Sequence, residues 1–247
     1  MDCIEARFYV GQDADAAADA ASRVWFRDCC ASTRRIVDEA AGALAASDAS
    51  APANRAGGRV LEVRLRIGEC EWLPILEASP AAMEELGRRG VSLRFSLLRG
   101  GIEVPAPPEG AIPDGEWLVS ACFCISGLGF SPEEAGRAVG LCADRARGVE
   151  EWPEVSKRQG LARAEWSLEE RSDSLSSTAP LFESLASRLR GRERAIGLFC
   201  AERGATCSIV SNATGSGGMF PCLEVESGAM RTFAELAAEL SFDPLLL

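Results

Sequence analysis

The stretch Pro74-Ile-Leu-Glu-Ala-Ser-Pro-Ala-Ala-Met83 recurs in altered form as Pro221-Cys-Leu-Glu-Val-Glu-Ser-Gly-Ala-Met230, with five of ten positions identical. Each stretch joins a short apolar segment to residues that favour a helix, and an apolar run typical of a strand follows. Two such matches at distant places in one chain indicate an internal repeat, and a repeat constrains the fold more than any single element does.

Two further matches occur in the same order along the chain. Residues 6–10 lie over residues 121–125, with Phe8 opposite Phe123, and Trp25 is matched with Trp166. The alternating and helical hydrophobic patterns also follow one another in the same order in both halves. We therefore predict an α+β fold made of two tandem copies of a small domain, each with a mainly antiparallel sheet packed by helices.

The boundary between the predicted copies is a stretch rich in proline and glycine. Residues 99–116 hold four prolines and four glycines in eighteen positions, a composition that cannot continue a helix or an interior strand. We predict a first, diverged copy at 1–98, an extended linker at 99–116 and a second copy at 117–247.

The secondary structure expected within the copies follows from periodicity and capping signals. Ser131-Pro132-Glu133-Glu134 is a helix start with a capping serine, a proline in the first turn and a glutamate three residues after the cap. The other expected helices cover 13–22, 32–46, 79–88, 178–190 and 227–238. The expected strands cover 4–10, 23–26, 60–67, 91–98, 117–125, 164–168, 195–200, 205–210 and 240–246.

Composition limits the kind of partner. The net charge is −11, which disfavours a phosphate backbone and so argues against nucleic acid, while it suits a basic protein. No apolar run approaches the roughly 20 residues that span a bilayer, and acidic residues stand where a signal peptide would be basic. We expect a cytoplasmic protein without a membrane segment.

The reactive residue types are few. There is no histidine, which excludes a Ser-His-Asp or Cys-His arrangement within the chain and the usual zinc ligand sets. Several of the ten cysteines fall in apolar strand-like runs, where a free thiol behaves as a small hydrophobe. We predict no metal site, no cofactor and no catalytic residue.

One loop of the second half combines an aromatic side chain with acids. Glu150, Glu151, Trp152 and Glu154 lie in a segment with no counterpart in the first half. Functional residues concentrate in such loops, and tryptophan is a frequent anchor of protein interfaces. These four residues are the predicted partner-binding site, the alternative being that Trp152 covers the core of its domain.

The second half resembles a bacterial family numbered 4279 in the domain-of-unknown-function series. The resemblance covers residues 117–247, and the first half shares it mainly through residues 72–98. It is carried by Phe123-x-Ile125-Ser126-Gly127, Ser131-Pro132-Glu133-Glu134, Trp152, Lys157-Arg158, Glu165-Trp166-Ser167-Leu168 and Met219-Phe220-Pro221. Some members of that family look like immunity proteins encoded beside toxins, and the family brings no catalytic residue with it.

Acidity, the lack of a catalytic set and the resemblance together favour a non-catalytic protein-binding protein. The specific hypothesis is an immunity protein that neutralises a cognate bacterial toxin. The alternative is a ligand-binding or structural module with a cleft between the two copies. An enzyme that uses carboxylates or a thiol is a third possibility, and oligomeric state is left open.

Overall fold

The computed structural model describes residues 3–10, 24–26, 33–46, 59–67, 76–99, 102–103, 117–172, 177–215 and 223–246. In the first half these form β1 (Cys3–Val10), β2 (Val24–Phe26), α1 (Thr33–Ala46), β3 (Arg59–Ile67), β4 (Leu76–Ala78), α2 (Pro80–Arg88), β5 (Val91–Arg99) and β6 (Ile102–Glu103). The second half begins with β7 (Trp117–Gly127), α3 (Pro132–Val139), β8 (Arg145–Arg147), a 3₁₀ turn (Val149–Glu151), α4 (Glu154–Arg158) and β9 (Ala164–Ser172). It continues with α5 (Ala179–Leu189), α6 (Glu193–Arg203), β10 (Thr206–Gly215), β11 (Leu223–Val225), α7 (Ser227–Glu235) and β12 (Glu239–Leu246).

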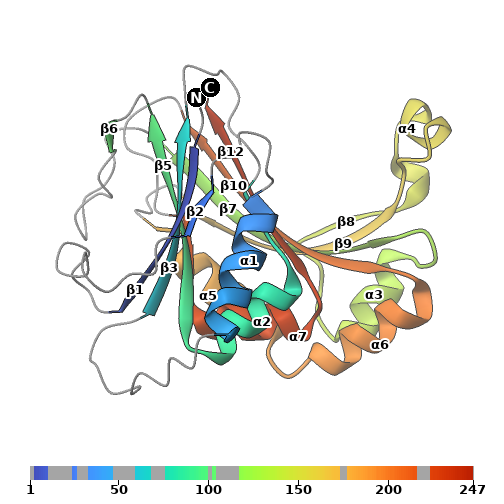
Figure 1. Cartoon of the computed structure of the whole chain (residues 1–247). Helices are drawn as coiled ribbons and strands as arrows, with labels where there is room; N and C mark the ends of the chain where they lie inside the picture. The colour runs from blue at the N-terminus through green and yellow to red at the C-terminus, as the bar shows by residue number, and fades with distance from the viewer. Residues whose placement is uncertain are drawn as a thin grey trace.

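The strands form two six-stranded sheets, which confirms the α+β class. The first sheet has the order β11-β5-β3-β1-β2, with β6 paired to β5, and the second has the order β4-β12-β10-β7-β9-β8. Among the described strands, β3 with β5 and β10 with β12 are the parallel pairs, and the other pairs are antiparallel. Figure 1 shows α1, α2, α5 and α7 grouped at one end of the sheets.

Each half lends one short strand to the sheet of the other half. β4 pairs with β12, with Ala78 opposite Leu240, and β11 pairs with β5, with Val225 opposite Leu93. Ala78 of β4 corresponds to Val225 of β11, and their pairing partners Leu240 and Leu93 correspond to each other. Both corresponding pairs are 147 residues apart in the chain, so the two exchanged strands pair in the same register. The exchanged strands are the repeated stretches of the sequence, although descent of the two halves from one sequence stays a prediction.

A buried threonine fixes each exchanged strand to a helix of its own half. The Thr33 hydroxyl at the start of α1 accepts a hydrogen bond from the backbone N–H of Glu77 at 2.9 Å. The Thr178 hydroxyl before α5 accepts from the N–H of Glu224 and donates to its carbonyl oxygen, both at 2.9 Å. These hydroxyl groups thus form hydrogen bonds with backbone groups on the edge of each short strand. Such backbone groups would cost free energy if they were buried without a partner.

The core is continuous across the two halves. Phe95 of β5 and Phe242 of β12 meet edge to face with ring centroids 5.2 Å apart, and Phe182 of α5 contacts Phe242 at 5.4 Å and Phe233 of α7 at 6.1 Å. These side chains belong to one cluster of buried residues that contains members of both halves. Aromatic side chains of this size contribute a large share of the buried apolar area.

Several predicted elements are confirmed. Ser131 caps α3 through the Glu134 N–H at 3.3 Å, and the Glu134 carboxylate accepts from the Ser131 N–H at 2.8 Å. Helices α1, α2, α5 and α7 begin and end within a few residues of their expected bounds. The expected helix at 13–22 lies outside the described residues. Among the described residues, no helix is both long and apolar enough to cross a bilayer.

The strand predicted at 195–200 is wrong, because these residues lie in α6. Ile196 and Phe199 are three residues apart and buried, whereas Leu198 between them is 54% exposed, a pattern of period 3.6 rather than 2. Gly204, between the two expected strands, has φ 60° and ends α6 in the left-handed conformation.

Two details of the predicted repeat also differ. In the sheet, Trp25 lies opposite Glu5, which is three residues before Phe8. Trp166 lies opposite Ile125, which is two residues after Phe123, the residue aligned with Phe8. The two tryptophans are therefore not equivalent in that alignment. Within the predicted linker, β5 continues to Arg99 and β6 pairs back onto it, while residues 104–116 lie outside the described part of the chain.

The close packing of α2 on α7 depends on a glycine. A Cβ at Gly87 would lie 2.7 Å from Arg231 Cγ, 3.1 Å from the Arg231 nitrogen and 3.2 Å from the Ser227 carbonyl oxygen. Gly87→Ala is therefore expected to lower the free energy of unfolding by about 1–2 kcal/mol through overpacking. Thermal or denaturant unfolding measures this change.

The control for this substitution is Gly42→Ala in α1, where no described atom outside the backbone of that helix lies within 4 Å of the added methyl group. That change is expected to leave stability unchanged or to raise it by about 0.5–1 kcal/mol through helix propensity. Equal stability of the Gly87→Ala and Gly42→Ala chains would contradict the proposed close helix contact.

Candidate functional site

The predicted partner-binding residues lie on a segment that projects from the second sheet. We call residues 145–165 the arm: it consists of β8, the 3₁₀ turn, α4 and the start of β9. Figure 1 shows α4 far from the sheets and joined to them only through the strands β8 and β9. The outer part of the arm thus projects from the body, while Val149 and Ala164 pack with the core cluster at its base.

Trp152 holds the two sides of the arm together. Its indole N–H donates to the Arg163 carbonyl oxygen at 2.7 Å, and the Arg147 guanidinium carbon lies 4.2 Å from its ring centroid. The side chain is half-buried within the arm. Trp152 therefore does not cover the core of its domain, and within the arm it acts as a structural tie.

The three predicted acidic residues are exposed, but two of them have partners inside the arm. The Glu151 carboxylate accepts from the Gly148 N–H at 3.1 Å, and Glu154 forms an ion pair with Lys157 at 2.9 Å. Residues 142–160 contain four acids and four bases, so the segment is electrically balanced. The acidity of the whole chain is not concentrated at the predicted site.

Two apolar side chains on the arm were missed in the sequence. Val155 of α4 is 60% exposed and Leu161, in the connection to β9, is 58% exposed. In the sequence neither side chain stands out, because the single Val155 and the pair Leu161-Ala162 could equally pack on the domain. Only the projection of the arm shows that no core is within reach.

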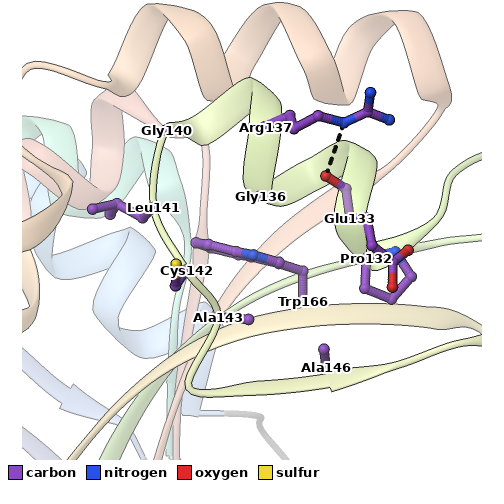
Figure 2. Close-up of a pocket in the computed structure, with 10 residues that line it drawn as sticks. All are labelled: Pro132, Glu133, Gly136, Arg137, Gly140, Leu141, Cys142, Ala143, Ala146 and Trp166. Carbon is purple, nitrogen blue, oxygen red and sulfur yellow. Dashed lines mark hydrogen bonds between the residues drawn. The ribbon is translucent and has the colours of Figure 1, made fainter.

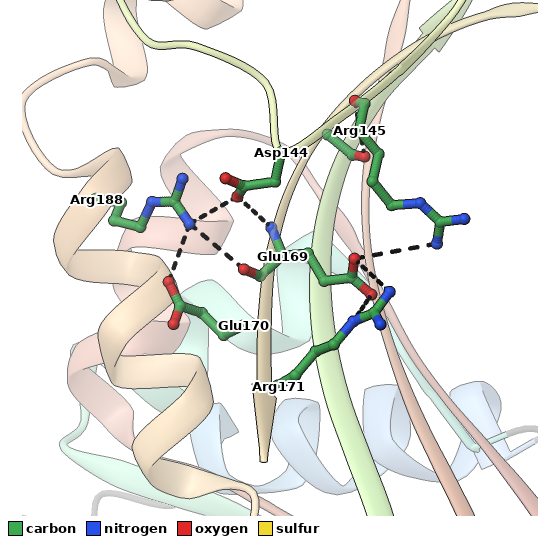
Figure 3. A network of polar contacts seen from close by, with 7 residues as sticks. Asp144, Arg145, Glu169, Glu170, Arg171 and Arg188 are labelled. Atoms are coloured by element: carbon green, nitrogen blue, oxygen red, sulfur yellow. Dashed lines mark hydrogen bonds and ion pairs between the residues drawn. The ribbon is translucent and has the colours of Figure 1, made fainter.

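A network of charged groups fixes the root of the arm to α5 (Figure 3). The Arg188 guanidinium contacts the Asp144 carboxylate at 2.8 Å and that of Glu170 at 3.0 Å. The same Asp144 oxygen accepts from the Glu169 backbone N–H at 2.8 Å. On the other side of β9, Glu169 pairs with Arg171 at 2.8 Å and with Arg145 at 4.0 Å.

The network predicts a pH-dependent contribution to stability. The hydrogen bond from Arg188 holds the pKa of Asp144 below its ordinary value of 3.8. A carboxyl group with a lowered pKa stabilises the fold above its unfolded pKa, and this contribution disappears as the pH falls through the folded value. Asp144→Asn is expected to cost about 0.5–1 kcal/mol at pH 7, a small effect because the group is partly exposed.

Unfolding of the Asp144→Asn chain and of the native chain, followed from pH 7 down to about pH 2, measures this difference. The gap between the two should close in acid. Glu150→Gln, at an exposed arm position, is the matched control and should show no gap at either pH. A gap for Asp144→Asn that persists unchanged in acid would contradict the charge-based account.

An open pocket lies between α3 and the root of the arm (Figure 2). Its volume is about 480 Å³. Trp166 of β9 forms the floor, and the lining residues are Pro132, Glu133, Gly136, Arg137, Gly140, Leu141, Cys142, Ala143, Ala146 and Trp166. At the seam between the two halves, where the alternative hypothesis expects a cleft, the rings of Phe95 and Phe242 are in contact. The cleft itself stays a prediction.

The described thiols differ in their environment. Burial raises the pKa of Cys122 and that of Cys124, the latter to about 12. The Cys200 and Cys207 sulfurs are 3.4 Å apart, and a hydrogen bond from Cys207 lowers the pKa of Cys200 and raises that of Cys207. Cys142 is exposed at the mouth of the pocket.

These differences predict the order in which the thiols react. The thiolate is the nucleophile, so at pH 7.5 iodoacetamide should modify exposed Cys142 at least about 100-fold faster than Cys124. Peptide mass mapping after timed quenching measures both rates. In denaturant the two rates should become equal, and equal rates in the folded chain would overturn the assigned burial.

Comparison with known protein families, curated proteins and solved structures found no match. The resemblance to the family numbered 4279 therefore stays a prediction. Among the residues that the structure describes, no group of three or more cysteine, aspartate or glutamate side chains is placed to hold a metal ion.

Proposed function

We propose that this chain is a non-catalytic protein-binding protein that contacts its partner through the arm. The observation that carries the proposal is the exposure of Val155 and Leu161, at 60% and 58%, on a segment that projects from the body. Apolar side chains at the centre of an interface, surrounded by polar groups, are typical of protein recognition. Here Glu150, Glu151 and Arg158 would provide the polar rim.

The internal bonds of the arm favour this role. Trp152 joins the two sides of the arm, and Arg188 and Asp144 join its root to α5. A segment that is ordered before it binds loses less conformational entropy on association than a flexible loop does. The arm is therefore suited to present Val155 and Leu161 in a fixed position.

The charge of the chain supports a basic partner. The net charge is −11, although the arm itself holds four acids and five bases, so attraction would act over the whole molecule rather than at the contact. Long-range attraction speeds encounter more than it tightens the complex. In the specific form that the resemblance implies, the partner is a toxin encoded beside this chain, and binding neutralises it.

The double variant Val155→Asp with Leu161→Asp tests the proposal. Burying two new charges in an interface core should weaken binding to the purified product of the neighbouring gene by at least about 30-fold. Calorimetry or biolayer interferometry gives the dissociation constants. A co-expression growth assay with that product then tests neutralisation.

The control variant is Leu198→Asp, because Leu198 is 54% exposed on α6, outside the arm. It should bind like the native chain. Native-like binding by the chain with Val155→Asp and Leu161→Asp would exclude the arm as the contact surface, and no complex with any neighbouring product would overturn the toxin form of the proposal.

A further inference from the structure

A pair of thiols lies at the junction of α6 and β10. Cys200 belongs to the last turn of α6, and Cys207 is the second residue of β10. Their sulfur atoms are 3.4 Å apart and share a hydrogen bond. Cys200 is half-buried, whereas Cys207 is 6% exposed. The pair thus has one sulfur that solvent reaches and one that the core covers.

The backbone around the pair holds the two thiols in place. The Cys200 carbonyl oxygen accepts a hydrogen bond from the Ala205 N–H at 3.0 Å, and Cys207 lies in the ladder of β10 with β7. The connection between helix and strand packs closely on the loop after β7, because a Cβ at Gly129 would lie 2.6 Å from the Arg203 carbonyl oxygen. The two sulfurs therefore face each other with their backbone already fixed.

The environment gives the two thiols different reactivity. The hydrogen bond from Cys207 lowers the pKa of Cys200, while the same bond and burial raise the pKa of Cys207. A lowered pKa increases the fraction of thiolate near neutral pH, and the thiolate is the form that attacks an electrophile. Cys200 is thus suited to react first with an oxidant from solvent, and Cys207 is suited to react with the product.

We propose that Cys200 and Cys207 form a reversible oxidation site whose oxidant is a hydroperoxide. The Cys200 thiolate attacks one peroxide oxygen, so that an S–O bond forms, the O–O bond breaks, and the leaving oxygen takes up a proton. The Cys207 sulfur then attacks the sulfur of the sulfenic acid. The S–S bond forms, the S–O bond breaks, and the departing hydroxide leaves as water with the Cys207 proton. Each sulfur loses one electron, and the peroxide gains both.

The step needs only a small movement and joins two elements. The sulfurs must approach from 3.4 Å to about 2.05 Å, which rotation of the two side chains can supply. In the reduced chain the end of α6 is held by packing and by the ion pair of Arg203 with Glu134 at 3.1 Å. Oxidation would add a covalent bond between α6 and the second sheet. The site lies outside the arm, and its chemistry does not require a partner protein.

Peptide mapping without reductant tests the proposal. The reduced full chain is treated with a small molar excess of hydrogen peroxide, its remaining thiols are blocked with iodoacetamide, and trypsin is added. Because trypsin cuts after Arg203, the disulfide should appear as peptide 195–203 joined to peptide 204–231. Tandem mass spectra distinguish Cys207 from Cys222 in the second peptide. Dithiothreitol should restore both thiols by thiol–disulfide exchange.

Variants test the order of the two reactions. In Cys207→Ala, oxidation should stop at the sulfenic acid of Cys200, so dimedone labelling of Cys200 should rise at least about tenfold over the native chain. In Cys200→Ser, Cys207 should stay reduced, because its sulfur is covered. The control is Cys142→Ser, which removes an exposed thiol outside the pair and should leave the linked peptides unchanged.

The proposal is contradicted by any of three results. These are the absence of the linked peptides from the native chain, equal dimedone labelling of Cys200 in the native and the folded Cys207→Ala chains, and oxidation of Cys207 at the native rate in the folded Cys200→Ser chain. The linked peptides come from the native chain, so they decide the proposal even if a variant does not fold.

Discussion

The packing of α2 against α7, with the exchange of β4 and β11 on either side, is the constraint on which the rest of the structure depends. Each short strand completes the sheet of the other half, and a buried threonine ties it to a helix of its own half. Neither sheet is complete without residues from both parts of the chain. Because β4 leads directly into α2 and β11 directly into α7, the helix contact at Gly87 and the two exchanged strands are linked through the chain.

The arm takes its position from this scaffold. α5 packs beside α7 through Phe182 and Phe233, and its Arg188 reaches Asp144 at the start of the arm. β9 carries both the ion pairs at the root and Trp166, the floor of the pocket. The position of the arm and that of the pocket beside α3 are thus both determined by β9. Because β9 packs in the core, the core fixes the place of the arm and of the pocket on the surface.

Much of the fold could be predicted from the sequence, because local signals agree with the tertiary structure. The capping box at Ser131 and the apolar faces of α5 and α7 are set by residues three or four apart, and these elements form as expected. The prediction of a strand at 195–200 was wrong because a short apolar run has no clear period in the sequence. The burial of Ile196 and Phe199 on one side of the segment stabilises a helix there. The exchange of β4 and β11 has no local signature, since which sheet a three-residue strand joins is decided by contacts more than 100 residues away.

In the candidate sites, too, contacts between residues far apart in the chain could not be predicted from the sequence. The sequence drew attention to Trp152 and its acidic neighbours, yet the indole bonds within the arm, and the exposed apolar side chains of the arm are Val155 and Leu161. The contact between the Cys200 and Cys207 sulfurs depends on where α6 ends and β10 begins, and it can be recognised only when both elements are placed. Hydrogen–deuterium exchange of the chain with and without its neighbouring gene product tests the central claim, that the arm is the contact surface, most directly. The account predicts that the partner slows exchange mainly in residues 149–161, and protection confined to the sheets with the arm unchanged would contradict it.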